Sequence, residues 1–92
     1  MVVIILERVS PSVRGEITRW MLELRAGIFV GNISAMVRDK LWELICAKFH
    51  GKGGGGILVH SADTEQGYSL RTIGNTSKAI EDFEGLFLVR TP

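Results

Sequence analysis

The chain begins with a continuous apolar segment, Val2–Leu6, that is rich in β-branched residues. Such a run is typical of a strand buried on both faces, so it predicts a central strand of a sheet. Ser10 and Pro11 then supply a helix cap and a first helical residue. The spacing predicts a helix from there to Arg25, with an apolar stripe formed by Val13, Ile17, Trp20, Met21 and Leu24. We expect Arg14 and Glu23 on the opposite, polar face of this helix.

A short strand is predicted next, over residues 26–31, and glycines lie near both of its ends. Ser34 follows as the cap of a second helix. Its apolar stripe consists of Val37, Leu41, Leu44, Ile45 and Phe49, and the charged residues from Arg38 to Lys40 are expected to face outward.

The second half of the chain has the pattern of a β-hairpin. A glycine-rich turn at residues 51–56 leads to a strand over 57–62, a turn over 63–67 and a strand over 68–74. A polar loop over 75–84 precedes a last short strand over 86–90. This order predicts an α+β sandwich of ferredoxin-like type, with two helices on one face of a mixed sheet and an extra C-terminal strand.

Length and composition favour a single domain over residues 1–92 that has a modest core. Eleven basic and ten acidic residues give a net charge of +1, which excludes a polycationic tail but not a local basic face. The lone cysteine, Cys46, lies in the second helical pattern, which favours a packing role and a reducing compartment. The first apolar run is too short for a signal peptide or a membrane span, so we expect a cytoplasmic protein and no membrane contact.

Few residues carry a pattern typical of catalysis. The glycines at 51, 53 and 56 follow a helix and precede a strand, the reverse of the order that binds dinucleotides. His50 and His60 have no third ligand at zinc spacing. Glu7 ends the first strand, where a functional carboxylate and an ordinary surface charge are equally common. Phosphodiester cleavage with a metal needs a second carboxylate, which a two-fold dimer could supply.

Basic residues are a second candidate feature. Five of them could line one face and bind phosphates without reading bases: Arg14, Arg25, Arg38, Lys40 and Lys78. A solvated helix face is the alternative for each of them.

Several segments resemble the CRISPR-associated Cas two (Cas2) family of type I-E systems. These are residues 22–35 (LELRAGIFVGNISA), Trp42 with Glu43, residues 64–68 (TEQGY) and residues 85–89 (GLFLV). The resemblance implies a ferredoxin-like fold and a homodimer in which C-terminal strands cross to the partner. It also implies a bridge between dimers of the CRISPR integrase, Cas1, that holds double-stranded pre-spacer DNA.

The same resemblance suggests roles for individual residues. Phosphate contacts map onto Arg14, Arg25, Arg38 and Lys78. Partner contacts map onto the C-terminal segment Leu86, Phe87, Leu88, Val89 and Arg90. Many relatives are magnesium-dependent endonucleases with an acidic metal ligand at the end of the first strand, and Glu7 stands there in this chain.

Three functions therefore stay open at this point. The favoured one is a non-catalytic DNA-binding subunit of the spacer-integration complex. The second is a metal-dependent endoribonuclease or endonuclease that uses Glu7 at the dimer axis, with Mg²⁺ as its cofactor. The third is a ferredoxin-like sensor or interaction domain that does not bind duplex DNA.

Overall fold

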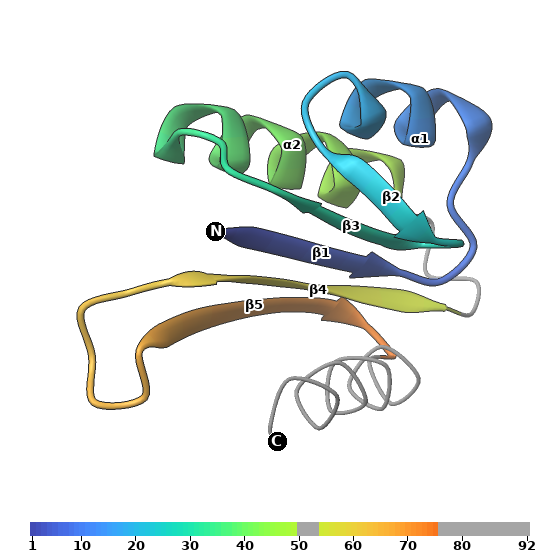
Figure 1. Ribbon diagram of the computed structural model, residues 1–92. Helices are drawn as coiled ribbons and strands as arrows, with labels where there is room; N and C mark the ends of the chain where they lie inside the picture. Colours follow the sequence, from blue (N-terminus) through green and yellow to red (C-terminus); the bar gives the residue numbers. More distant parts are fainter. Residues whose placement is uncertain (50–53, 76–92) are drawn as a thin grey trace.

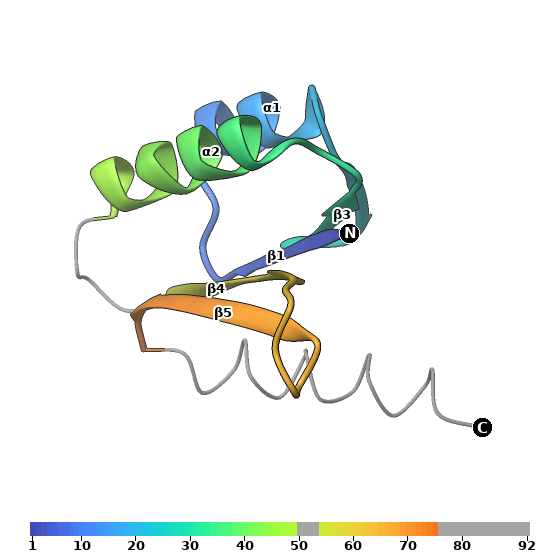
Figure 2. The ribbon, with the colours of Figure 1, turned by 90° about the vertical axis from the view of Figure 1, so that its left-hand side faces the viewer.

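The computed structural model describes residues 1–49 and 54–75 of the chain. Within these residues two helices and a five-stranded sheet are formed. The helices lie on one face of the sheet, as Figures 1 and 2 show from two sides. In chain order the elements are β1 (Val2–Leu6), α1 (Pro11–Thr18), β2 (Leu22–Arg25), β3 (Ile28–Gly31), α2 (Ala35–Lys48), β4 (Gly55–Ser61) and β5 (Tyr68–Gly74). The strand order across the sheet is β2-β3-β1-β4-β5.

Strand β1 occupies the centre of the sheet, as its apolar sequence predicts. It pairs antiparallel with β3 on one side and with β4 on the other. Val2 and Ile4 point toward the helices, while Val3 and Ile5 belong to a cluster on the opposite face. Both faces of the strand are therefore apolar, because both are packed.

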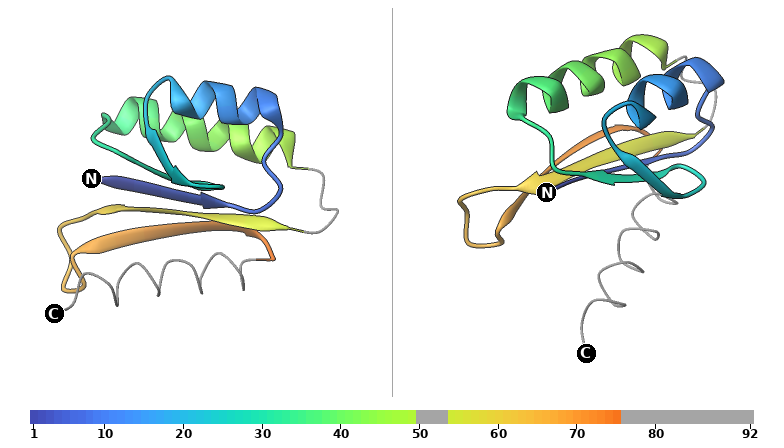
Figure 3. Two further views of the ribbon diagram at one scale, coloured as in Figure 1. Left: turned by 45° about the vertical axis from the view of Figure 1, so that its right-hand side comes forward. Right: turned by 45° about the horizontal axis from the view of Figure 1, so that its top comes forward.

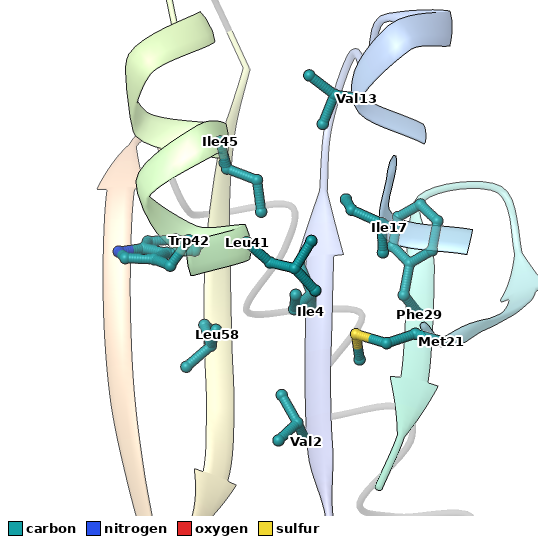
Figure 4. Packing of buried hydrophobic residues seen from close by; sticks show 10 residues of the cluster. All are labelled: Val2, Ile4, Val13, Ile17, Met21, Phe29, Leu41, Trp42, Ile45 and Leu58. Atoms are coloured by element: carbon teal, nitrogen blue, oxygen red, sulfur yellow. The ribbon is translucent and has the colours of Figure 1, made fainter. Parts of the chain in front are cut away.

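The helices begin where the sequence predicts. The Oγ of Ser10 accepts a hydrogen bond from the backbone N–H of Val13 at 3.3 Å, and the Oγ of Ser34 accepts one from Val37 at 3.2 Å. Figure 4 shows the resulting core between helices and sheet, with its side chains converging from both layers. Its buried members are Val2, Ile4, Val13, Ile17, Met21, Phe29, Leu41, Trp42, Ile45 and Leu58.

The predicted extent of the first helix is wrong. Helix α1 ends at Thr18, and Leu22–Arg25 forms the edge strand β2, which pairs antiparallel with β3. The hydroxyl of Thr18 donates back to the carbonyl of Arg14 at 2.9 Å, a local bond that competes with helix continuation. Trp20 and Leu24, assigned to the helix stripe, are 52% and 51% exposed.

All strand pairings among the described residues are antiparallel, so the expectation of a mixed sheet is corrected. The ferredoxin-like α+β fold itself is confirmed, with β5 as a further strand after the βαββαβ unit. Strand β4 starts two residues earlier than predicted, and β5 has the predicted bounds. The strand predicted over 86–90 lies outside the described residues, as does the glycine turn over 51–53.

A second apolar cluster lies on the sheet face opposite the helices. Its buried members are Ile5, Ile28, Ile57 and Val59. Strand register extends this face into one row across all five strands, formed by Leu22, Val30, Val3, Val59 and Leu70. The two ends of the row, Leu22 and Leu70, are 63% and 42% exposed. Neither described helix covers this face.

The length and apolarity of a helix decide whether it can cross a membrane. Among residues 1–49 and 54–75, no helix is both long and apolar enough to cross a bilayer.

Two glycines with the same backbone geometry differ in their surroundings and so make a matched test. Gly27 has φ +82° and a Cβ there would collide with the carbonyl oxygen of Leu6, whereas Gly67 has φ +81° and open space around it. We expect Gly67→Ala to cost about 1–2 kcal/mol, the penalty of a left-handed residue. Gly27→Ala should cost about 1–3 kcal/mol more, because the clash adds to that penalty. Urea unfolding of both variants measures the difference, and equal losses would contradict the close approach of the β2–β3 turn to β1.

Candidate nucleic-acid interface

One end of the sheet gathers most of the charged residues that the sequence singles out. Strand β1 ends there, the chain turns into α1, and the β2–β3 turn lies beside it (Figure 3). Two backbone hydrogen bonds fix this junction: Leu6 N–H donates to Gly27 O at 2.8 Å, and Glu7 N–H donates to Gly55 O at 2.9 Å. Charged residues on three separate segments are thereby brought to a common end of the molecule.

A hollow of about 520 Å³ opens at this end. Its walls include Glu7, Arg8 and Arg14 together with Gly27 of the β2–β3 turn. Arg8 is exposed and has φ +58°, a left-handed conformation that is uncommon for a residue other than glycine. A second hollow, of about 330 Å³, lies between the same loop and the two helices. Glu7 and Arg8 border both.

Arg14 is held in place by an acid on the neighbouring hairpin. Its Nε donates to Glu23 Oε2 at 3.1 Å, and the same oxygen accepts the backbone N–H of Gly27 at 3.0 Å. The Arg14 side chain is 42% exposed and the Glu23 side chain 22%. A guanidinium has five N–H donors, so the ones beyond Nε stay available for a phosphate.

Arg25 lies at the same end of the sheet but on the other face. It ends β2, is exposed, and its register partner is Ile28 of the cluster opposite the helices. Arg14 and Arg25 therefore approach the end of β1 from opposite faces. The sequence placed Arg25 at the end of a helix, and the structure corrects this to the end of an edge strand.

Arg38 lies toward the other end of the sheet, where β1 begins. Its Nε donates to Asp39 Oδ1 at 3.0 Å, and Arg71 of β5 reaches the same oxygen at 3.0 Å. An Arg38 terminal nitrogen lies 3.3 Å from Nδ1 of His60. The Arg38 side chain is only 17% exposed, so the expectation that it faces outward is corrected. The structure does not bring Arg38 together with Arg14 and Arg25.

The two arginines near the start of β1, Arg38 and Arg71, change the pKa of Asp39. The hydrogen bond from Arg38, aided by its charge and by Arg71, holds the pKa of Asp39 below its ordinary value of 3.8. The carboxylate thus stays ionised across the neutral range and links α2 to β5.

Glu7 is half-buried, and its neighbourhood decides what chemistry it could support. Among the described residues, no group of three or more His, Cys, Asp or Glu side chains is arranged to hold a metal ion. Arg8 and Arg14, not further acids, share its hollow. A magnesium site at Glu7 therefore stays a prediction that would need ligands from elsewhere.

Cys46 has the packing environment that its sequence pattern predicts. It is partly buried against the core between helices and sheet. Burial raises the pKa of its thiol, which opposes formation of the reactive thiolate.

Two predicted groups lie outside the described residues. These are Lys78 and the C-terminal segment Leu86, Phe87, Leu88, Val89 and Arg90.

Sequence reasoning missed three residues that matter at these sites. Arg8 directly follows Glu7 at the end of β1, and that position was the available signal. Glu23 was assigned to a solvated helix face, although the alternation of Leu22–Arg25 could have indicated a strand with Glu23 on one side. Arg71 had no signal, because its pairing with Asp39 depends on the tertiary fold.

Taken together, the fold and this charged end define a small ferredoxin-like α+β domain with arginines presented around the end of its central strand. The family model described as CRISPR-associated protein (Cas_Cas2CT1978) matches residues 1–88. Since the match spans nearly the whole chain, the chain belongs to the CRISPR-associated Cas2 family of type I-E systems. A role in spacer acquisition follows from this membership.

The lowered pKa of Asp39 predicts how stability should depend on pH. A carboxylate whose pKa is depressed on folding stabilises the protein above its unfolded pKa and loses that effect as the pH falls through the folded value. We expect Asp39→Asn to destabilise the protein at pH 7, with the difference from the wild type shrinking as the pH falls below 3.8.

Denaturant unfolding at several pH values measures this difference. Glu65→Gln, in the exposed β4–β5 turn, is the matched control and should change stability little at any pH. A pH-independent gap between Asp39→Asn and the wild type would contradict the ion-pair account.

Proposed function

We propose that this protein is a structural, duplex-DNA-binding subunit of the CRISPR spacer-acquisition complex, in which it bridges dimers of the Cas1 integrase. The observation that carries the proposal is Arg14, which lines an open hollow and whose guanidinium is anchored through Nε. Family membership supports the spacer-acquisition setting, since Cas2 proteins typically work with Cas1.

The charges favour contact with phosphates over readout of bases. Arg8, Arg14 and Arg25 lie on separate segments around one end of the sheet, so they can follow a backbone without any element entering a groove. Their contribution to affinity would come from counterion release and would be independent of sequence. Such binding suits a subunit that must accept any captured duplex.

Arg38 and Lys78 complete the proposed set of phosphate contacts. We assign Arg38 a smaller share, because Asp39 already takes its Nε and its side chain is largely covered. Lys78 rests on the sequence alone.

A homodimer is the assembly that we propose. The apolar row that runs from Leu22 to Leu70 crosses the sheet face that neither described helix covers, and its exposed ends would be buried by a second copy. The longest dimension of the described part of one chain is 35 Å, which matches about ten base pairs at 3.4 Å each.

The integrase contact is proposed from sequence alone. Residues 86–90 carry it, and co-purification of Cas1 with a chain that lacks 86–92 would test it.

The alternative is a metal-dependent endonuclease or endoribonuclease that uses Glu7 and Mg²⁺. Its support is the position of Glu7 at the end of β1, beside an open hollow. Against it stand the arginines that share this hollow, since a cation site needs several oxygen ligands. We therefore favour the structural role.

Arg14→Ala tests the phosphate contact. Loss of one neutralised phosphate should weaken duplex binding and make the slope of log affinity against log salt shallower by about 0.9. Arg19→Ala is the matched control. Arg19 is an exposed arginine at the C-cap of α1, and it pairs with Glu16 at 3.0 Å. Fluorescence anisotropy of a labelled duplex at several salt concentrations measures both. Equal effects of the two variants would contradict a specific role for Arg14.

Glu7→Gln separates the two functions. In a spacer-integration reaction reconstituted with Cas1, the structural role predicts full activity, because only the charge of one side chain changes. Glu43→Gln, at an exposed position of α2, is the control for loss of an acid. Integration that collapses for Glu7→Gln, while the complex still assembles on a gel-filtration column, would favour the nuclease.

A further inference from the structure

We propose that Glu23 is a positioning residue, which holds Arg14 so that its guanidinium meets a DNA phosphate at the hollow beside the end of β1. The inference rests on the proposed function and deepens it. The sequence predicts Arg14 as one of the phosphate contacts, but nothing in the sequence pattern assigns Glu23 a part in binding.

A single carboxylate oxygen makes the arrangement. Glu23 Oε2 accepts from Arg14 Nε at 3.1 Å and from the backbone N–H of Gly27 at 3.0 Å. The first bond takes the one donor nearest the side-chain stem. In the described part of the chain no further bond to the Arg14 guanidinium occurs, so its outer N–H groups remain for a ligand.

The second bond ties this arginine to the frame of the sheet. Gly27 N–H is held by Glu23, and Gly27 O accepts from Leu6 N–H at 2.8 Å. These hydrogen bonds connect Arg14 on α1, through the β2–β3 turn, to the last residue of β1. The guanidinium is therefore fixed relative to the hollow that Arg8 and Arg14 border.

Fixing the side chain matters because a free arginine loses rotamer freedom when it binds. Immobilising such a side chain on association weakens binding by about twofold to tenfold. A carboxylate that holds the guanidinium beforehand removes part of that loss. The same principle of preorganisation makes arginine effective at planar, bidentate phosphate contacts.

The positioning role and simple electrostatics predict opposite effects on DNA binding when Glu23 is removed. An acid beside a DNA-binding surface repels phosphates, so its removal should strengthen binding if charge alone counts. Glu16 provides the reference, because this acid also pairs with an arginine, the C-cap residue Arg19 of α1, at 3.0 Å, but lies outside the hollow.

The experiment is a mutant cycle on duplex affinity. Duplex binding is measured by fluorescence anisotropy for the wild type, Glu23→Ala, Arg14→Ala and the double variant, with Glu16→Ala as the control. Thermal unfolding of each variant checks that it is folded. We expect Glu23→Ala to weaken binding by about threefold to tenfold, and to have no weakening effect once Arg14 is already alanine. Glu16→Ala should leave affinity unchanged or raise it.

The outcomes separate this inference from the proposed function. A folded Glu23→Ala that binds as tightly as the wild type, or that weakens binding equally with and without Arg14, overturns the positioning role alone. If the wild type shows no salt-dependent duplex binding, the proposed function fails and the inference with it.

A second variant covers the case in which Glu23→Ala does not fold. Glu23→Gln keeps an oxygen acceptor for the Gly27 N–H but loses the charge that binds the guanidinium. The same cycle then gives a coupling, which is the factor by which the effect of Glu23→Gln on duplex affinity changes when Arg14 is already alanine. A coupling of at least about threefold supports the positioning role, and a smaller coupling overturns it.

Discussion

The contact between the β2–β3 turn and the end of β1 determines where the charged groups at this end of the sheet lie. Leu6 N–H donates to Gly27 O at 2.8 Å, and the absence of a Cβ at Gly27 lets the turn come so close. Because the same glycine donates its N–H to Glu23, the turn also determines the position of Arg14 on α1. A backbone requirement at one residue thus fixes a side chain on another element.

The two charged regions differ in how their arginines are used. At the end of β1, Glu23 takes one donor of Arg14, a residue that lines an open hollow, and no other bond to this guanidinium occurs among the described residues. Near the start of β1, two arginines share Asp39, and the larger part of Arg38 is covered. Exposed ion pairs contribute little stability on their own, whereas a shared carboxylate that joins α2 to β5 constrains their relative position. We therefore propose the first region as the binding surface, and we interpret the second as a structural link.

The fold was predictable from sequence where a residue pattern fits only one kind of secondary structure. The unbroken run in β1 predicts a strand packed on both faces, and Ser10 and Ser34 predict helix starts, all of which the structure confirms. The end of the first helix was not predictable in this way. Trp20 and Leu24 continue the helical spacing, yet Leu22–Arg25 also alternates with the period of a strand. Pairing with β3, a tertiary interaction, decides between them.

The candidate site was predictable only in part, for a related reason. The family resemblance pointed to Arg14, Arg25 and Arg38, but ion-pair partners on other elements determine which guanidiniums stay open. Glu23 and Arg71 become visible only when the hairpin and β5 are in place.

The most direct test of the central claim is a spectrum of arginine side chains during a DNA titration. In ¹H–¹⁵N spectra of the Nε–H groups, a short duplex should shift the Arg14 and Arg25 signals. The Arg19 signal should stay in place, and the Arg38 signal should change less than that of Arg14. Shifts centred on Arg38 and Arg71, with Arg14 unaffected, would contradict the assignment of the binding surface to the end of β1.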